Sequence, residues 1–149
     1  MKKAVKTYDI IIKKRFYLLE SIKALLSDLS KERVIENFYF IGGTALSYYL
    51  NHRISYDVDF ISNRKLPYND LMALSVKYNG KYIPDSNATI FKINTGNDLR
   101  EYKMLFNIKS IKVEFFYPND PVRLAILEKY KDDFTLINGI KTLNINAIV

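Results

Sequence analysis

The chain has 149 residues, of which 48% are hydrophobic and 26% charged, and this predicts one soluble domain with a single hydrophobic core. It contains no cysteine, which excludes disulfides and thiolate metal sites, and it has no run of the ~20 apolar residues that a membrane span needs. The formal net charge of +7 is compatible with a polyanionic partner such as RNA or a nucleotide, and equally with a merely basic surface. No apolar segment follows the N-terminal lysines, so we expect no signal peptide and a cytoplasmic protein.

The first predicted element is a long amphipathic helix that spans Tyr8 to Leu29, where apolar residues recur at helical spacing. We expect this helix to cover one side of a sheet. A short helix is predicted from Ser30 to Glu36, and it is followed by an apolar strand from Asn37 to Ile41.

Two glycines, Gly42 and Gly43, end that strand and precede a predicted helix from Thr44 to Asn51. A turn of this kind, placed directly before a helix, exposes backbone N–H groups to which a phosphate can bind. The segment therefore indicates a phosphate-binding turn.

A second strand is predicted from Tyr56 to Ile61, and it carries Asp57 and Asp59. Residues two apart on a strand point to the same face, so the two carboxylates should stand side by side and repel each other. A bound cation stabilises such a pair, and Mg²⁺ suits it because Mg²⁺ binds one or two carboxylates together with substrate phosphates. The alternative is a polar strand edge without a metal, which the nearby glycine turn makes the weaker interpretation.

The remainder of the chain predicts further helices and strands, several of them joined by short turns. They are a helix from Pro67 to about Gly80, a short strand at Tyr82–Ile83, strands at Ala88–Asn94, Glu101–Ile108 and Ile111–Tyr117, a helix at Val122–Tyr130, and a hairpin at Asp133–Leu143. This mixture of helices with hairpin-linked strands predicts an α+β fold with a mixed sheet.

Glu114 is the best candidate for a third carboxylate, because it lies in the middle of an apolar strand between Val113 and Phe115. An acidic residue in that setting is unusual unless it is exposed or functional. Two interpretations stay open: a site shared with the two aspartates, or a solvent-facing position beside Lys112.

The order of these features resembles a known family. The segments that carry the resemblance are Gly42-Gly43-Thr44, Asp57-Val58-Asp59 and Val113-Glu114-Phe115, and they match the motifs of the nucleotidyltransferase-β superfamily. More narrowly, G-G-T-A-L followed by H-R-x-S-x-D-x-D resembles the AbiEii/AbiGii-type toxin nucleotidyltransferases of bacteria. The match covers roughly Phe38 to Tyr117.

The resemblance implies a nucleotidyltransferase-like mixed sheet with helices packed on it. It also implies transfer of a nucleotidyl group from an NTP such as ATP to a hydroxyl of an acceptor, with Mg²⁺ or Mn²⁺ as cofactor. The acceptor would be an RNA such as tRNA, or a protein, and the basic charge suits RNA. The implied phosphate-binding residues are Gly42, Gly43, Thr44 and Arg53, and the implied metal-binding and catalytic residues are Asp57, Asp59 and Glu114.

By the same resemblance the protein would be the toxin of a toxin–antitoxin or abortive-infection pair, with a cognate antitoxin as partner. Such toxins continue into a C-terminal helical region, and we expect residues 1–149 to form a single catalytic domain without it. The alternative is a catalytically degenerate nucleotidyltransferase fold that binds nucleotide, RNA or antitoxin without turnover. A metal-free RNA-binding domain is less favoured, because no strand interleaves basic and aromatic residues as a base-stacking platform would.

Overall fold

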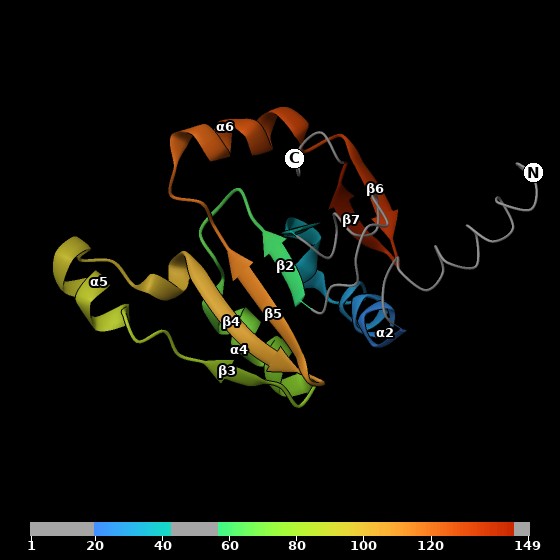
Figure 1. The fold of residues 1–149 in the computed structure, drawn as a ribbon, viewed down its shortest axis with the longest axis horizontal. Coiled ribbons are helices and arrows are strands. Elements are labelled where there is room, and N and C mark those ends of the chain that lie inside the picture. Colours follow the sequence, from blue (N-terminus) through green and yellow to red (C-terminus); the bar gives the residue numbers. More distant parts are fainter. Residues whose placement is uncertain (1–19, 43–56, 145–149) are drawn as a thin grey trace, which may run out of the picture.

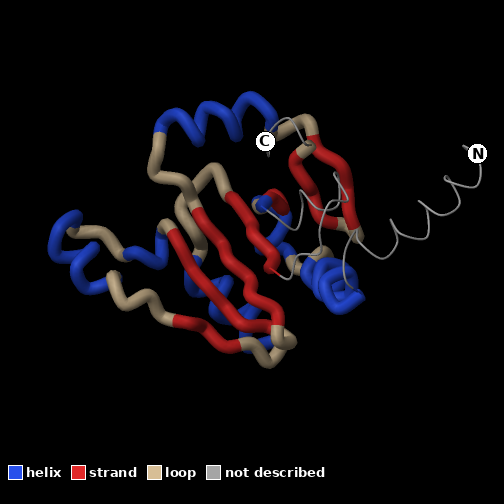
Figure 2. Tube along the Cα trace, viewed as in Figure 1, coloured by secondary structure: helices blue, strands red, loops and turns tan. Residues whose placement is uncertain are grey.

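The computed structural model describes residues 20–42 and 57–144, and within them it places seven strands in one mixed sheet of order β3-β4-β5-β2-β1-β7-β6 (Figures 1 and 2). The predicted α+β fold is confirmed. The elements are α2 (Glu20–Leu29), η1 (Arg33–Asn37), β1 (Tyr39–Ile41), β2 (Asp57–Ile61), α4 (Tyr68–Lys77), β3 (Lys81–Ile83), α5 (Ala88–Thr95), η2 (Leu99–Glu101), β4 (Lys103–Ile108), β5 (Ile111–Phe116), α6 (Pro121–Tyr130), β6 (Phe134–Ile137) and β7 (Ile140–Leu143).

Short turns and long connections together produce the mixed sheet. The turns at Lys109-Ser110 and Asn138-Gly139 both have two successive residues with positive φ, which suits a tight hairpin, and they make β4–β5 and β6–β7 antiparallel. β2 instead pairs parallel with β5, and β1 pairs parallel with β7. The parallel pairs join strands that lie far apart in the sequence.

One face of the sheet carries the main hydrophobic core, and α2 and α4 cover it; in Figure 1, α4 lies behind β4 and β5. Aromatic rings occupy its centre. Phe60 of β2 stacks on Phe115 of β5 with ring centroids 5.2 Å apart, and Phe38 meets Phe115 edge-on at 5.1 Å. All three rings are almost fully buried. We call this side the helix-covered face.

The opposite face holds a smaller core, in which Leu127 of α6 packs with Tyr39, Ile61 and Leu143. Ile61 is the last residue of β2, so α6 covers the carboxyl end of that strand (Figure 1). The residues before Ile61 on this side of β2 are Asp59 and Asp57.

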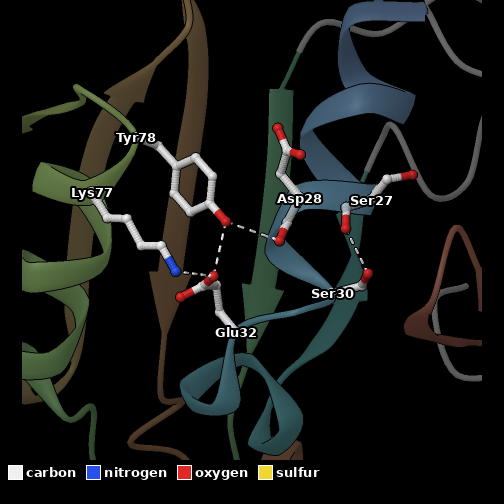
Figure 3. Close-up of polar contacts among 6 residues, drawn as sticks. All are labelled: Ser27, Asp28, Ser30, Glu32, Lys77 and Tyr78. Carbon is white, nitrogen blue, oxygen red and sulfur yellow. Dashed lines mark hydrogen bonds and ion pairs between the residues drawn. The ribbon is translucent and has the colours of Figure 1, made fainter.

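A polar cluster joins the segment after α2 to the end of α4 (Figure 3). The carboxylate Oε2 of Glu32 accepts hydrogen bonds from Lys77 Nζ and from the Tyr78 hydroxyl, both at 2.8 Å. The same hydroxyl lies 3.1 Å from the carbonyl oxygen of Asp28. Burial, reinforced by the Glu32 carboxylate, raises the pKa of Tyr78 to about 12, so the hydroxyl remains a donor at neutral pH.

The prediction of a strand at Ala88–Asn94 was wrong, because this segment forms the helix α5. Local signals at both ends explain the difference. Asp85 accepts hydrogen bonds from the N–H groups of the two residues that begin the helical turn, and Gly96 ends the helix in the left-handed conformation at φ +74. Ile90 and Ile93 are exposed, so their spacing does not mark a buried strand face.

Several other predictions hold within the described residues, including the strands that carry Asp57, Asp59 and Glu114. The helix predicted for Thr44–Asn51 and residues 8–19 of the first predicted helix lie outside those residues. No helix in the described part of the chain is long and apolar enough to cross a membrane.

The aromatic core gives a stability prediction. Phe115→Ala should lower the free energy of unfolding by about 3–5 kcal/mol, because it removes a fully buried ring that touches Phe38 and Phe60. Phe134→Ala is the matched control, since its ring is 38% exposed and its loss should cost far less. Urea unfolding of both variants measures the difference, and equal losses would contradict this description of the core.

Candidate active site

The parallel register of β2 and β5 brings the predicted acidic residues together. Asp59 is the direct neighbour of Glu114, and Asp57 is the direct neighbour of Lys112. Adjacent strands lie about 4.8 Å apart, and cross-strand neighbours point to the same face of a sheet. Asp59 and Glu114 therefore lie side by side on the face opposite the main core, with Asp57 two residues before Asp59. We call this side the carboxylate face.

The electrostatics of Asp59 reflect this placement. Burial, reinforced by the negative charges of Glu114 and then of Asp57, raises the pKa of Asp59 to about 6, and the positive charge of Lys112 opposes the shift. Glu114 and Asp57 are thus close enough for their charges to raise the pKa of Asp59. A carboxylate that is half-buried among other carboxylates favours a bound cation when it is ionised.

Gly42 lies against the same carboxylate. It follows Ile41, which pairs with Asp59 across β1 and β2, and its φ is +88. A Cβ atom added to Gly42 would lie 3.0 Å from Cγ of Asp59 and closer still to its Oδ2. Only glycine fits at this position, because both the backbone angle and the space exclude a side chain. Gly42 therefore lies directly against the Asp59 side chain.

The chemistry of these donors suits Mg²⁺, which takes oxygen ligands and uses one or two protein carboxylates together with phosphates. Asp57, Asp59 and Glu114 offer carboxylate oxygens on one face, next to Gly42. Across residues 20–42 and 57–144, no three His, Cys, Asp or Glu side chains are grouped closely enough to hold a metal ion by themselves.

The structure describes four of the residues predicted for the site and leaves three undescribed. Asp57, Asp59 and Glu114 share a face, and Gly42 adjoins Asp59. The other residues predicted to bind phosphate, Gly43, Thr44 and Arg53, lie outside the described residues.

Sequence reasoning missed the position of Lys112. The alternation of β5 places Lys112 on the face of Glu114, but only the parallel register shows that it adjoins Asp57. No local signal in the sequence specifies that pairing.

Comparison with known proteins gives a family match. The family described as "Nucleotidyl transferase AbiEii toxin, Type IV TA system" matches residues 24–148. No curated protein sequence matches the chain.

Two solved structures resemble the fold. A "tRNA-processing enzyme (apo form I)" is 15% identical with a TM-score of 0.47, over 81% of this chain and 29% of the other. A "tRNA nucleotidyltransferase complexed with a primer tRNA and an incoming ATP analog" is 16% identical with a TM-score of 0.42, over 81% of this chain and 32% of the other. The chain thus spans about a third of the length of these proteins.

The raised pKa of Asp59 predicts a stabilising substitution. Its pKa is about 6 in the folded protein against 3.8 ordinarily, so the folded state binds more protons between these values and loses stability as the pH rises through them. Above pH 6 the full shift corresponds to about 3 kcal/mol at about 1.4 kcal/mol per pKa unit, and solvent screening of the partly exposed carboxylate lowers this to about 1–2 kcal/mol. Asp59→Asn should therefore stabilise the metal-free protein by about 1–2 kcal/mol at pH 7.5, and the gain should shrink towards pH 4.

Urea unfolding of the metal-free protein at pH 7.5 and pH 4 measures this effect. Asp70→Asn serves as the control, because Asp70 is an exposed residue of α4 and should change stability little at either pH. A variant Asp59→Asn that is no more stable than the wild type at pH 7.5 would contradict the crowding of carboxylates described above.

Gly42 and Gly96 form a matched pair for a second prediction. Both have positive φ, but a Cβ at Gly96 would meet nothing within 4 Å. Gly96→Ala should therefore cost only the backbone term, about 1–2 kcal/mol, whereas Gly42→Ala should cost more because it also displaces the Asp59 carboxylate. In an Asp59→Ala background the excess should largely vanish, and thermal unfolding of the four variants tests this. Equal costs for the two glycines would show that Asp59 does not lie against Gly42.

Proposed function

Because the chain belongs to the AbiEii nucleotidyltransferase toxin family of type IV toxin–antitoxin systems, we propose that it transfers a nucleotidyl group from an NTP to a hydroxyl of an RNA. The observation that carries the proposal is the pairing of Asp59 with Glu114, beside Asp57 and against the Gly42 turn. By the resemblance given in the sequence analysis, these residues would correspond to the metal-binding and phosphate-binding motifs of such enzymes.

The proposed roles follow from position. Asp57 and Asp59 would hold Mg²⁺, for which Mn²⁺ could substitute. When bound, the metal supplies positive charge that neutralises the phosphates and the developing charge of an in-line displacement. Gly42, Gly43 and Thr44 would bind the triphosphate through backbone N–H groups, and Arg53 would pair with a phosphate.

Glu114 lies beside Asp59 on β5, which flanks β2 on the side opposite β1 and Gly42, and this supports a role for Glu114 on the acceptor side. It either completes the metal site or accepts the proton of the acceptor hydroxyl. The hydroxyl oxygen forms a bond to the α-phosphorus, the bond from that phosphorus to the oxygen bridging the α- and β-phosphates breaks, and pyrophosphate leaves. The proton of the hydroxyl passes to a carboxylate.

An RNA acceptor, with tRNA as the first to test, is preferred to a protein acceptor because the chain carries a net charge of +7. The family description further supports a role as the toxin of a pair, with an antitoxin as partner. We propose a cytoplasmic site of action, where NTPs and tRNA are available.

The second candidate is a degenerate fold that binds a nucleotide, RNA or antitoxin without turnover. The described segments hold no group of three side chains that could bind a metal alone, and this observation favours it. The crowding of Asp59 by two other acids favours the enzyme, because a binding module has no evident need for a carboxylate that destabilises its own fold.

Labelling with α-³²P NTPs tests the enzyme. With Mg²⁺ and total tRNA, the wild type should label RNA from at least one of the four NTPs. Asp57→Ala combined with Asp59→Ala should abolish labelling, and Glu114→Gln should reduce its rate by about 100-fold or more. Asp70→Ala, on the helix-covered side, should label like the wild type.

The other outcomes distinguish the alternatives. Label found on protein rather than RNA would show that the acceptor is a protein, and the proposed nucleotidyl transfer would still stand. Nucleotide binding without labelling by any NTP, on either tRNA or protein, would favour the binding module.

A further inference from the structure

A row of polar side chains crosses the carboxylate face from the edge of the sheet to the candidate site. Lys81 of β3 pairs with Asn107 of β4, Asn107 pairs with Lys112 of β5, and Lys112 pairs with Asp57 of β2. All four side chains are exposed. We call Lys81, Asn107 and Lys112 the lysine row. It follows the strand order β3-β4-β5-β2, which Figure 1 shows from the edge strand inwards.

A second row runs beside the lysine row, with two apolar residues at the sheet edge followed by two acids. Ile83 pairs with Leu105, Leu105 pairs with Glu114, and Glu114 pairs with Asp59. Ile83 is 40% exposed although it is a large hydrophobic residue. Ile83 and Leu105 also line a shallow pocket of about 240 Å³ at the sheet edge. This row thus provides an accessible apolar surface that leads to the two acids.

The two lysines of the lysine row are available to an anion. In the described part of the chain neither Lys81 nor Lys112 forms an ion pair, whereas Lys103, on the same face, pairs with Asp85 at 3.7 Å. Two strand spacings separate Lys81 from Lys112, which is about 10 Å. Two separated positive charges beside an apolar strip match a strand of nucleic acid, in which phosphates alternate with bases.

The position of the lysine row relative to Gly42 indicates which substrate it serves. Gly42 approaches Asp59 from β1, on one side of β2, and the lysine row approaches from β5, on the other side. An in-line displacement needs the attacking and leaving oxygens on opposite sides of the phosphorus. The pyrophosphate of the NTP would lie on the Gly42 side, so the acceptor hydroxyl arrives from the side of the lysine row.

We propose that the lysine row and the adjoining Ile83 and Leu105 form the surface that binds the acceptor RNA strand beside the carboxylates. Lys81 and Lys112 contact its phosphates, and the two apolar side chains contact a base. The inference rests on the proposed function, because that function supplies a nucleic-acid acceptor. It adds the location of the acceptor and the residues that hold it.

The test measures binding of a fluorescein-labelled, 12-nucleotide single-stranded RNA to the full chain over a range of salt concentrations. Lys81→Gln combined with Lys112→Gln should weaken binding roughly tenfold at 0.1 M salt. It should also make the slope of log K against log salt shallower by about 1.4, because each phosphate contact to a single strand contributes about 0.7. Each single variant should show about half of the change in slope.

Lys31→Gln combined with Arg33→Gln is the matched control, because it removes the same charge from exposed positions around η1, on the helix-covered side. Its salt slope should equal that of the wild type. If both double variants reduce the slope equally, the attraction is a property of net charge and the inference fails. It also fails if the wild type binds no RNA.

A second measurement separates acceptor from donor. Binding of the non-hydrolysable α,β-methylene analogues of the four NTPs, with Mg²⁺, should be little changed in the variant of the lysine row. Weakened analogue binding with unchanged RNA binding would assign the lysine row to the NTP and overturn the inference. Because neither measurement needs turnover, RNA binding that depends on Lys81 and Lys112 would support this surface even if labelling experiments found no nucleotidyl transfer.

Discussion

The parallel register of β2 against β5 is the constraint on which the rest of the site depends. It places Asp59 beside Glu114, and a shift of one residue would turn one of these acids into the main core. Buried neighbours fix the register from the other face, where Phe60 stacks on Phe115. The aromatic core thus determines where the carboxylates lie, although none of its rings is part of the site.

This placement has an energetic consequence. Asp59 is half-buried, close to two other acids and against Gly42, and its raised pKa shows that the folded protein disfavours its charged form. Such strain is typical of functional sites, where a bound ligand offsets a cost that the empty protein carries. A divalent cation and the phosphates that accompany it are ligands of that kind. If the proposed function is right, the candidate site favours a bound state over maximal stability of the empty fold.

Much of this could be predicted from the sequence, because alternation along β2 and β5 depends only on local pattern. The two-residue hairpin turns likewise depend only on residues that are adjacent in the sequence. The helix α5 was missed because the alternation over Ala88–Asn94 was interpreted as a strand, whereas the hydrogen bonds of Asp85 and the left-handed Gly96 at its two ends favour a helix. Register across β3, β4, β5 and β2 is set by tertiary packing, so the neighbours of Asp57 could not be found before the structure was known.

The most direct measurement of the central claim is an anomalous difference map from a crystal of the full chain with Mn²⁺ and a non-hydrolysable NTP analogue. The account predicts a manganese peak bonded to the carboxylates of Asp57 and Asp59 and to a phosphate oxygen, with Glu114 on the side away from Gly42. A nucleotide bound elsewhere, or a manganese peak that contacts neither aspartate, would contradict it.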